Sequence, residues 1–288
     1  DRPRLFSRHQ LVLDMGNEDV INYLKETFLK TFDGVALDYF KWDCNRPLSQ
    51  TGSAVLPAER QGEAAHRHIL GVYKLQKWFK ETYPNCFLEN CAGGGGRYDL
   101  GMMKFSSMIW TSDNTDPIER LTIQFGTSLC YPALTMGAHV SASRRASYET
   151  KKNVALWGSF GYELNPLNLT DEEREVTAEM IEAYHKYYDV IHYGDLYRLE
   201  YPTDDASRAA WMFVSEDKSE ALLTVALNLK SFVTTHNHRL RGLDPEKFYR
   251  VEGTEEVYSG ALLMNAGINL TDKVYNDGDS IVKYFVAE

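Results

Sequence analysis

Short apolar runs alternate with stretches of helical periodicity over the first two-thirds of the chain. The apolar runs predict buried strands at residues 35–41, 86–89, 106–111 and 133–138. Segments with an apolar residue every three to four positions predict helices at 17–30, 57–82, 117–125 and 148–157. This alternation is typical of βαβ units, in which helices connect and cover the strands of a parallel sheet. We therefore expect an α/β fold over residues 1–193.

Two helices carry clear start signals. Asn17 is a suitable N-cap for the first. The apolar stripe of that helix consists of Val20, Ile21, Leu24 and Phe28. Thr170 and Glu173 have the spacing of a capping box, which predicts a helix from there to about Tyr188.

After Gly194 the pattern changes to β-rich segments separated by turns. These segments lie at 211–214, 221–227, 248–251 and 280–286. The connections at 216–219 and 276–279 have the acidic, Ser, Asn and Gly composition of turns. We expect a small antiparallel β domain of the sandwich type over residues 194–288.

The composition excludes several classes of function. The chain has 288 residues, with 31 Lys and Arg against 41 Asp and Glu, which gives a net charge of −10. An acidic chain repels the phosphate backbone, so we expect no nucleic acid partner. The mean hydropathy is −0.41. No apolar run reaches the roughly 18 residues that indicate a membrane helix, so we expect no membrane partner.

The cysteines favour a reducing compartment. They are Cys44, Cys86, Cys91 and Cys130. Four are too few for a disulfide scaffold, and they form no Cys-x-x-Cys pair. No histidine pair has the spacing of a zinc site, so we expect no metal. Reduced thiols favour a cytoplasmic location over a secreted one.

The first candidate for chemistry lies at the end of the run 35–41. Alternate side chains of a strand share a face, so we expect Lys41 and Asp43 to share a face with Leu37. The carboxyl ends of parallel strands are where α/β folds place their active sites. A cation beside a carboxylate favours its ionised form. The alternative is a structural ion pair at the end of a strand.

A second candidate follows the run 106–111. Asp116, Pro117 and Glu119 have the spacing of an N-cap, a first-turn proline and a third-position glutamate, so we assign Asp116 to capping. Asp113 has no capping role and lies just beyond a strand. It is therefore the better candidate for a catalytic carboxylate, with a solvated loop residue as the alternative.

Four consecutive glycines, Gly93 to Gly96, follow the run 86–89. They lack the Gly-Lys-Ser/Thr ending of a P-loop and the spacing of a dinucleotide-binding turn. Consecutive glycines allow positive φ angles and close approach of the backbone to a ligand, and the alternative is a flexible loop. Two carboxylates at the ends of different parallel strands suit glycoside hydrolysis.

These segments together resemble glycoside hydrolase family 36, the retaining α-galactosidases. The motifs similar to that family's nucleophile motif, glycine-rich substrate loop and acid/base motif are Lys41-Trp42-Asp43-x-Asn45, Cys91-x-x-Gly94-x-x-Arg97 and Ser112-Asp113-Asn114-Thr115-Asp116. The resemblance covers essentially the whole chain, with further matches at 10–14, 136–141, 160–164, 211–221 and 240–249.

The resemblance implies a double displacement on terminal α-D-galactosyl residues. It implies Asp43 as the nucleophile and Asp113 as the acid/base. The implied contacts to the sugar come from Lys41, Asn45, Arg8, Cys91 and Gly94. The implied substrates are galacto-oligosaccharides of the melibiose and raffinose type. No metal or organic cofactor is implied, and the implied oligomer is a homotetramer.

The family's catalytic domain is a (β/α)₈ barrel preceded by a large β domain. By resemblance, residues 35–41 are barrel strand four, so the chain would hold strands four to eight of a TIM barrel followed by the small β domain. The chain begins with Asp1 and no signal-peptide pattern follows, which suggests a start inside a longer protein. We expect both catalytic carboxylates but about half of the sugar site here. We also expect an exposed edge at strand four and no activity of residues 1–288 alone.

Two other functions remain open on sequence alone. A galactosyltransferase that forms raffinose or stachyose resembles the same family and shares its core motifs. A non-catalytic carbohydrate-binding module is the second alternative, although a binder needs neither a nucleophile nor a proton donor.

Overall fold

The computed structural model describes residues 5–142, 145–202, 208–228, 236–270 and 276–288. The chain forms two compact units, Asp1–Asp113 and Asn114–Glu288.

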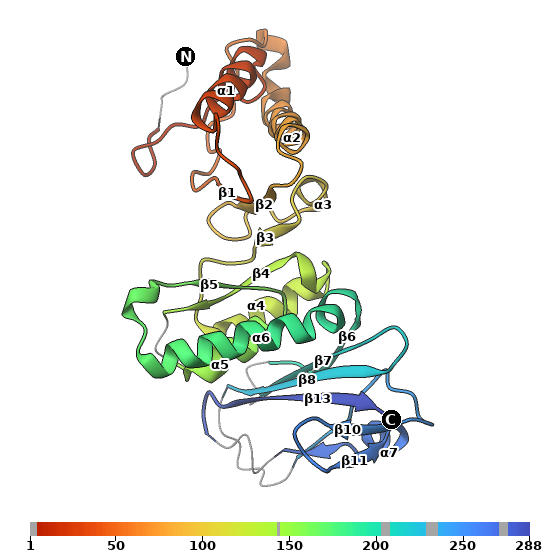
Figure 1. The fold of residues 1–288 in the computed structure, drawn as a ribbon. Coiled ribbons are helices and arrows are strands. Elements are labelled where there is room, and N and C mark those ends of the chain that lie inside the picture. The colour runs from red at the N-terminus through yellow and green to blue at the C-terminus, as the bar shows by residue number, and fades with distance from the viewer. Residues whose placement is uncertain (1–4, 143–144, 203–207, 229–235, 271–275) are drawn as a thin grey trace. The chain divides into compact units, whose positions relative to one another are not determined.

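The first unit alternates parallel strands with helices (Figure 1). Its strands are β1 (Tyr39–Asp43), β2 (Phe87–Cys91) and β3 (Met108–Trp110). Its helical elements are α1 (Glu18–Thr31), the 3-10 turn η1 (Ala58–Glu63), α2 (Ala64–Thr82) and the short α3 (Leu100–Met103). β1 pairs with β2 and β2 pairs with β3, both in parallel. This is the βαβ arrangement that the hydrophobic pattern predicts.

Helix α1 forms where its sequence signals place it. The side chain of Asn17 accepts a hydrogen bond from the backbone N–H of Asp19 at 3.0 Å, which confirms the predicted N-cap. The predicted apolar stripe packs in one core cluster with Val72 and Leu75 of α2, and Ile21 at its centre is 1% exposed. The stripe therefore fixes α1 against α2.

Strand β1 begins later than the apolar run predicts. Residues 35–38 form no strand, and the pairing with β2 starts at Tyr39. Leu37 does not share the face of Lys41 and Asp43, which corrects the expectation. It packs with Phe40 in the core on the helix side of the strands. Leu37 is apolar because it packs against this aromatic core, whereas Val35 and Ala36 are exposed and belong to no strand.

The predicted helix at 57–82 is divided in two. Its first turn is η1, and α2 starts only at Ala64. The side-chain amide of Gln61 donates to the backbone carbonyls of Ser53 and Leu56 at 2.8 and 2.6 Å. These bonds tie η1 to the preceding loop and hold it apart from the regular helix.

The second unit begins with a further parallel pair. Its elements up to residue 193 are α4 (Pro117–Ser128), the turn η2 (Ala133–Thr135), β4 (Met136–Ser141), α5 (Tyr148–Ala155), β5 (Ser159–Glu163), the turn η3 (Pro166–Asn168) and α6 (Asp171–Tyr193). β4 pairs with β5 in parallel. Both hydrogen bonds of the capping box between Thr170 and Glu173 are present, as predicted.

Strand β5 is not among the predicted strands, because its sequence, Ser-Phe-Gly-Tyr-Glu, contains no apolar run.

The tail is antiparallel, as predicted. One sheet has the order β11-β10-β13-β8-β7-β6, and β9 and β12 form a separate two-stranded ladder. The strands are β6 (Asp195–Glu200), β7 (Arg208–Val214), β8 (Glu220–Leu227), β9 (Asn237–His238), β10 (Phe248–Val251), β11 (Val257–Ser259), β12 (Ile268–Asn269) and β13 (Ser280–Ala287). The short helix α7 (Gly260–Asn265) lies between β11 and β12 in sequence.

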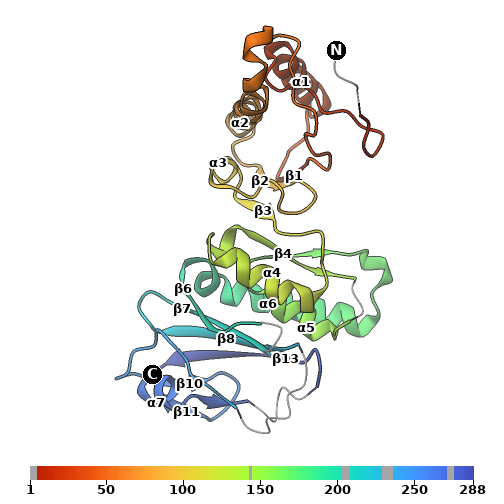
Figure 2. The same ribbon diagram turned by 180° about the vertical axis from the view of Figure 1, so that it is seen from behind.

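Helices separate the two kinds of sheet within the second unit. Figures 1 and 2 show α4, α5 and α6 between the β4–β5 pair and the six-stranded sheet. Trp157, which follows α5, stacks on Trp211 of β7 with ring centroids 4.0 Å apart. The compact units divide after Asp113, so α6 and β6, on either side of residue 194, both lie in the second unit. The expected domain limits 1–193 and 194–288 stay a prediction.

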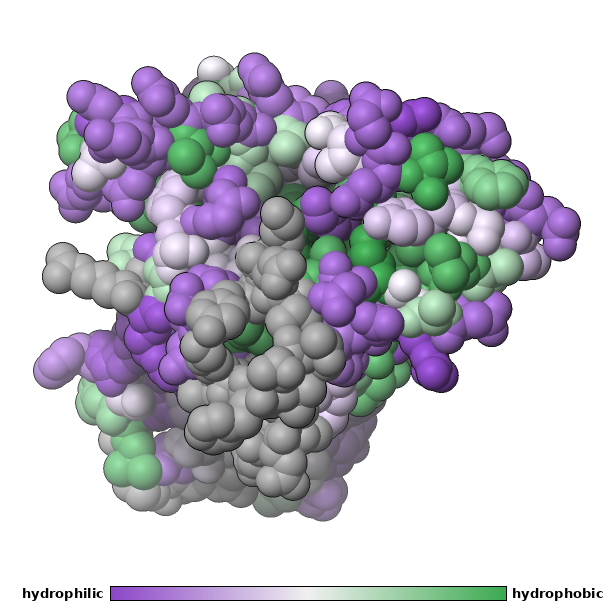
Figure 3. All heavy atoms as spheres, turned by 90° about the horizontal axis from the view of Figure 1, so that it is seen from below, coloured by the Kyte–Doolittle hydropathy of each residue, from purple (hydrophilic) through white to green (hydrophobic). Residues whose placement is uncertain are grey.

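No helix among the described residues is long and apolar enough to cross a bilayer. On the face seen in Figure 3, hydrophobic residues form scattered patches among hydrophilic ones. Such a mixture is ordinary for a protein surface.

Candidate active site

The two faces of β1 have different partners. Phe40 and Trp42 point toward the helices, where Trp42 contacts Phe28 of α1 at a ring-centroid distance of 5.3 Å. Lys41 and Asp43 therefore lie on the opposite face, together with Tyr39. Their register partners on β2 are Phe87 for Tyr39, Glu89 for Lys41 and Cys91 for Asp43. The face away from the helices thus carries polar groups at the carboxyl ends of both strands.

Asp43 is the last residue of β1, and its side chain is exposed. One carboxylate oxygen accepts a hydrogen bond from the backbone N–H of Cys44 at 2.8 Å, and the other accepts from the side-chain amide of Asn45. The amide oxygen of Asn45 accepts from the backbone N–H of Gly93 at 2.9 Å. Asn45 therefore fixes the orientation of Asp43 and links it to the glycine loop.

Lys41 is held by a carboxylate that the sequence analysis did not single out. Its ammonium group lies 3.3 Å from Glu89, whose side chain is 0% exposed. The hydroxyl of Tyr39 donates to the same carboxylate, and the Lys41 ammonium lies 4.6 Å from the ring centroid of Trp110 on β3. Lys41 and Asp43 share a face of the strand, as expected. The residue directly beside Lys41 on the neighbouring strand β2 is Glu89, whereas Asp43 lies two positions further along β1.

Cys91 ends β2 beside Asp43. Burial raises the pKa of the Cys91 thiol to about 11, and its hydrogen bond to Asp43 contributes in the same direction. The side chain is therefore a neutral thiol near neutral pH, able to donate a weak hydrogen bond.

The glycine loop packs directly on the segment that carries Asp113. Gly94 has φ +80°, and a Cβ there would lie 2.9 Å from the backbone nitrogen of Asp113 and 2.9 Å from Cα of Ser112. Gly93 also has a positive φ, of +57°, but faces open space. Only glycine allows both the left-handed conformation and the close approach at position 94. The loop thus brings the ends of β1, β2 and β3 together.

Asp113 itself is exposed in the loop after β3. The residues that follow it are firmly held within the second unit. Arg120 donates to the carbonyl oxygen of Asn114 at 2.7 Å, and the hydroxyl of Ser141 donates to that of Thr115 at 2.8 Å. The side chain of Asp116 accepts from the first backbone N–H groups of α4, which confirms its predicted capping role.

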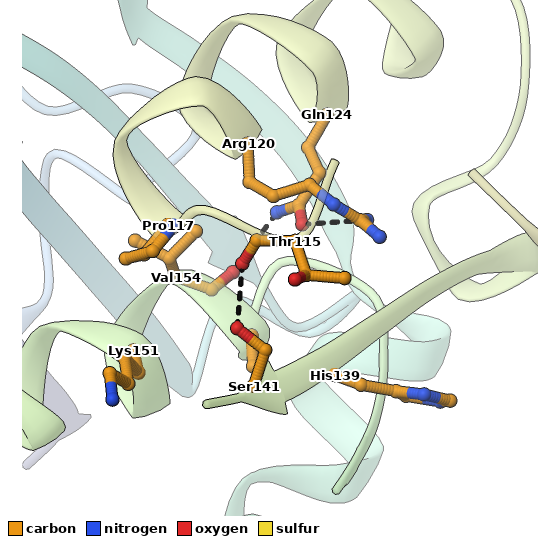
Figure 4. Close-up of a pocket in the computed structure, with 9 residues that line it drawn as sticks. Thr115, Pro117, Arg120, Gln124, His139, Ser141, Lys151 and Val154 are labelled. Atoms are coloured by element: carbon orange, nitrogen blue, oxygen red, sulfur yellow. Dashed lines mark hydrogen bonds between the residues drawn. The ribbon is translucent and has the colours of Figure 1, made fainter. Parts of the chain in front are cut away.

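Figure 4 shows a pocket lined by Thr115, Arg120, Gln124 and Ser141 beside this turn. Its volume of about 10 Å³ is at the lower limit for a single water molecule. It is too small for a sugar.

Arg8 is exposed at the tip of a tight turn closed by hydrogen bonds between Ser7 and Gln10. The preceding residues reach the end of β1, because the side chain of Arg46 donates to the carbonyl oxygen of Leu5. The role of Arg8 stays a prediction.

The structure therefore gathers Lys41, Asp43, Asn45, Cys91, Gly94 and Asp113 at the ends of three neighbouring parallel strands. Tyr39, Glu89 and Trp110 are additions that the sequence analysis missed. Strand alternation could have found Glu89, because it lies two positions before Cys91 and shares its face.

The sequence model of the Melibiase family matches residues 1–194, and that of the glycosyl hydrolase family 36 C-terminal domain matches residues 208–285. The alpha-galactosidase AgaA of Geobacillus stearothermophilus is 43% identical over 94% of this chain, and Mel36A of Lactobacillus acidophilus is 42% identical over 91%. The chain spans 38% and 36% of the lengths of these two relatives.

Solved structures agree with these matches. A crystal structure of an AgaA variant in complex with raffinose superposes with a TM-score of 0.95 at 41% identity, covering 100% of this chain and 41% of the other. Another AgaA variant, in complex with stachyose, gives the same TM-score. The fold is therefore part of a (β/α)₈ barrel followed by a C-terminal β domain. This fold and its site define the chain as part of a glycoside hydrolase. It belongs to the Melibiase family, within glycoside hydrolase family 36.

Proposed function

We propose that the protein is a retaining α-galactosidase that removes terminal α-D-galactosyl residues from galacto-oligosaccharides. Its similarity to proteins named alpha-galactosidases supports this substrate class, because variants of one of them, AgaA, have been crystallised with raffinose and with stachyose. The observation that carries the proposal is the chain of contacts from Asp43 through Asn45 and Gly93 to Gly94 and Asp113. It links the carboxylate of Asp43, at the end of β1, to the backbone of Asp113, after β3, through the glycine loop.

In the first step Asp43 attacks the anomeric carbon of the galactosyl group. The bond to the leaving-group oxygen breaks as a covalent galactosyl ester with Asp43 forms, and Asp113 gives its proton to the departing oxygen. Asn45 and the N–H of Cys44 hold the carboxylate for this attack. Because donors bind its two oxygens, Asp43 stays in one orientation as a nucleophile.

In the second step Asp113, now ionised, takes a proton from water. The water oxygen attacks the anomeric carbon and releases Asp43, so galactose leaves with its α configuration retained. This mechanism requires the two carboxyl groups about 5–5.5 Å apart in the active enzyme. It uses no metal or organic cofactor.

The remaining site residues are proposed as contacts to galactose. Lys41 would donate to sugar hydroxyls from its fixed place above Glu89 and Trp110. Asn45, Cys91 and the backbone at Gly94 offer further polar contacts, and Arg8 would approach from the amino-terminal turn. Tight placement of Lys41 favours a substrate with hydroxyls in one arrangement.

The direct test is hydrolysis by the protein at its natural length. We expect release of nitrophenol from nitrophenyl α-galactoside and of galactose from raffinose, with no hydrolysis of the β-galactoside. Sucrose as an acceptor separates hydrolysis from galactosyl transfer: formation of raffinose as the main product would favour the galactosyltransferase. Binding of galactosides without turnover would favour a carbohydrate-binding module.

Two further features are proposed for the whole protein. A homotetramer is the expected oligomer, and light scattering of the natural-length protein measures it. A cytoplasmic location is expected over a secreted one, and cell fractionation distinguishes them.

A further inference from the structure

A group of metal-ligating side chains lies in the tail, among the elements that follow residue 194. Glu200, His236 and His238 each offer one ligand atom, and these atoms lie within 4.8 Å of one another. Within the described ranges of the chain, no other three Asp, Glu, His or Cys side chains meet this condition.

Two separate elements bring the group together. Glu200 is the last residue of β6. His238 lies in β9, and His236 precedes it by two positions, a spacing that places both rings on one side of an extended segment. His236 Nε2 and His238 Nδ1 each lie 2.7 Å from the same oxygen, Oε1 of Glu200. Both imidazoles thus face one oxygen of the same carboxylate.

The burial of the group is graded. The side chain of His238 is 4% exposed, that of Glu200 is 22% exposed and that of His236 is 36% exposed. Glu200 and His236 also line a surface pocket of about 750 Å³. The group is therefore held firmly from one side and can be reached by an ion from the other.

We propose that Glu200, His236 and His238 form a zinc-binding site. Two imidazoles and one carboxylate are a ligand set that Zn²⁺ accepts, with a fourth position left for water. Zinc bonds to nitrogen and oxygen are about 2.0–2.2 Å long, which puts neighbouring ligand atoms of a tetrahedron ~3.4 Å apart. From 2.7 Å, the Glu200 oxygen therefore has to withdraw by less than ~1 Å from each ring nitrogen. The two ring nitrogens, which lie within 4.8 Å of one another, have to reach the same spacing.

Binding also requires a free electron pair on each facing ring nitrogen. In a neutral imidazole the proton on that nitrogen moves to the other ring nitrogen, and a protonated imidazole releases one proton to solvent.

Among the described residues, three arginines line the same pocket as Glu200 and His236. Arg208 lies 3.7 Å from the second oxygen of Glu200, and Arg239 and Arg241 line the same pocket. Arg208 orients the carboxylate and leaves Oε1 to the ion, as outer partners of metal ligands do. Its charge also repels the ion, so we expect an exchangeable site. The bound ion would tie β9 to the end of β6 and stabilise the folded tail by mass action.

The test uses the natural-length protein without a histidine tag, stripped with a chelator and then equilibrated with ZnCl₂ near neutral pH. After desalting, mass spectrometry of the metal should find one equivalent of zinc more in the wild type than in His236→Ala. Zinc should raise the Tm of the wild type and not that of His236→Ala. Co²⁺ should give the visible absorption of a tetrahedral site in the wild type alone.

The variants are chosen so that folding does not decide the outcome. His236 is half-buried, and Glu200→Gln keeps the size of the side chain, whereas His238→Ala opens a buried position. Glu200→Gln should weaken zinc binding at least tenfold. His185→Ala, on the exposed side of α6, should bind zinc like the wild type. Equal zinc content and equal Tm shifts in the wild type and His236→Ala would overturn the proposal, whatever the galactosidase assay gives.

Discussion

At the scale of single residues, the most constrained side chain of the candidate active site is Glu89. It is fully buried, and its partners include the Lys41 ammonium and the Tyr39 hydroxyl. Glu89→Gln keeps the shape and removes the charge that holds Lys41. A hydrogen bond to a charged group is worth about 1.5–3 kcal/mol, so we expect kcat/KM for α-galactosides to fall roughly ten- to a hundredfold.

Glu63→Gln is the matched control for this variant. Glu63 also pairs with cations, Arg60 and Arg67, but on the exposed surface of the first unit. Steady-state kinetics should show wild-type kcat/KM for this control. A folded Glu89→Gln protein with unchanged kcat/KM would remove Glu89 from the account.

The thiols provide a second prediction at this scale. Because burial raises the pKa of Cys91 to about 11, thiolate is scarce there near neutral pH, whereas Cys130 is exposed. Iodoacetamide should therefore modify Cys130 and spare Cys91, as measured by peptide mass spectrometry. In urea both should react. Equal reaction rates of the two thiols in the native protein would contradict the burial of Cys91 beside Asp43.

At the scale of elements, the glycine loop positions the loop that carries Asp113. A left-handed conformation costs a residue with a Cβ about 1–2 kcal/mol. Gly94→Ala pays this cost and also places a Cβ 2.9 Å from the backbone of Asp113. Gly93→Ala has the same kind of strain but faces open space, so it is the matched control. We expect kcat/KM of Gly94→Ala at least tenfold below that of Gly93→Ala. Equal kinetics of the two variants would show that the contact with Asp113 does not matter.

The sequence predicts most elements whose signals are local. The cap at Asn17, the capping box at Thr170 and the cap at Asp116 are all present, because each depends on residues within one helical turn. Strand β5 was missed, because its polar sequence becomes a strand only through its parallel partner β4.

Long-range contacts limit what the sequence could say about the site. Motif resemblance selected Asp43 and Asp113, but local pattern left each of them with an alternative. The partnership of Lys41 with Glu89 depends on strand register, which is set by the packing of β1 against β2. The same holds for the contact between Gly94 and Asp113.

At the scale of the whole molecule, the parallel sheet has an edge at β1. β1 is its terminal strand, and the aromatic pair of Tyr39 and Phe87 on the polar face is 48% and 40% exposed. The chain also spans only 38% of the length of its relative AgaA. We therefore expect purified residues 1–288 alone to lack α-galactosidase activity and to aggregate at this edge. Hydrolysis of an α-galactoside by this segment would refute the expectation.

In the proposed mechanism, Asp43 attacks the anomeric carbon. The most direct test of this step is Asp43→Gly in the natural-length protein, assayed with nitrophenyl α-galactoside with and without sodium azide. The variant lacks the attacking carboxylate, so we expect hydrolysis to be lost. Azide fits the space left by the side chain and attacks from the same face, so it should restore nitrophenol release and yield β-galactosyl azide. Unchanged hydrolysis by Asp43→Gly would contradict the account.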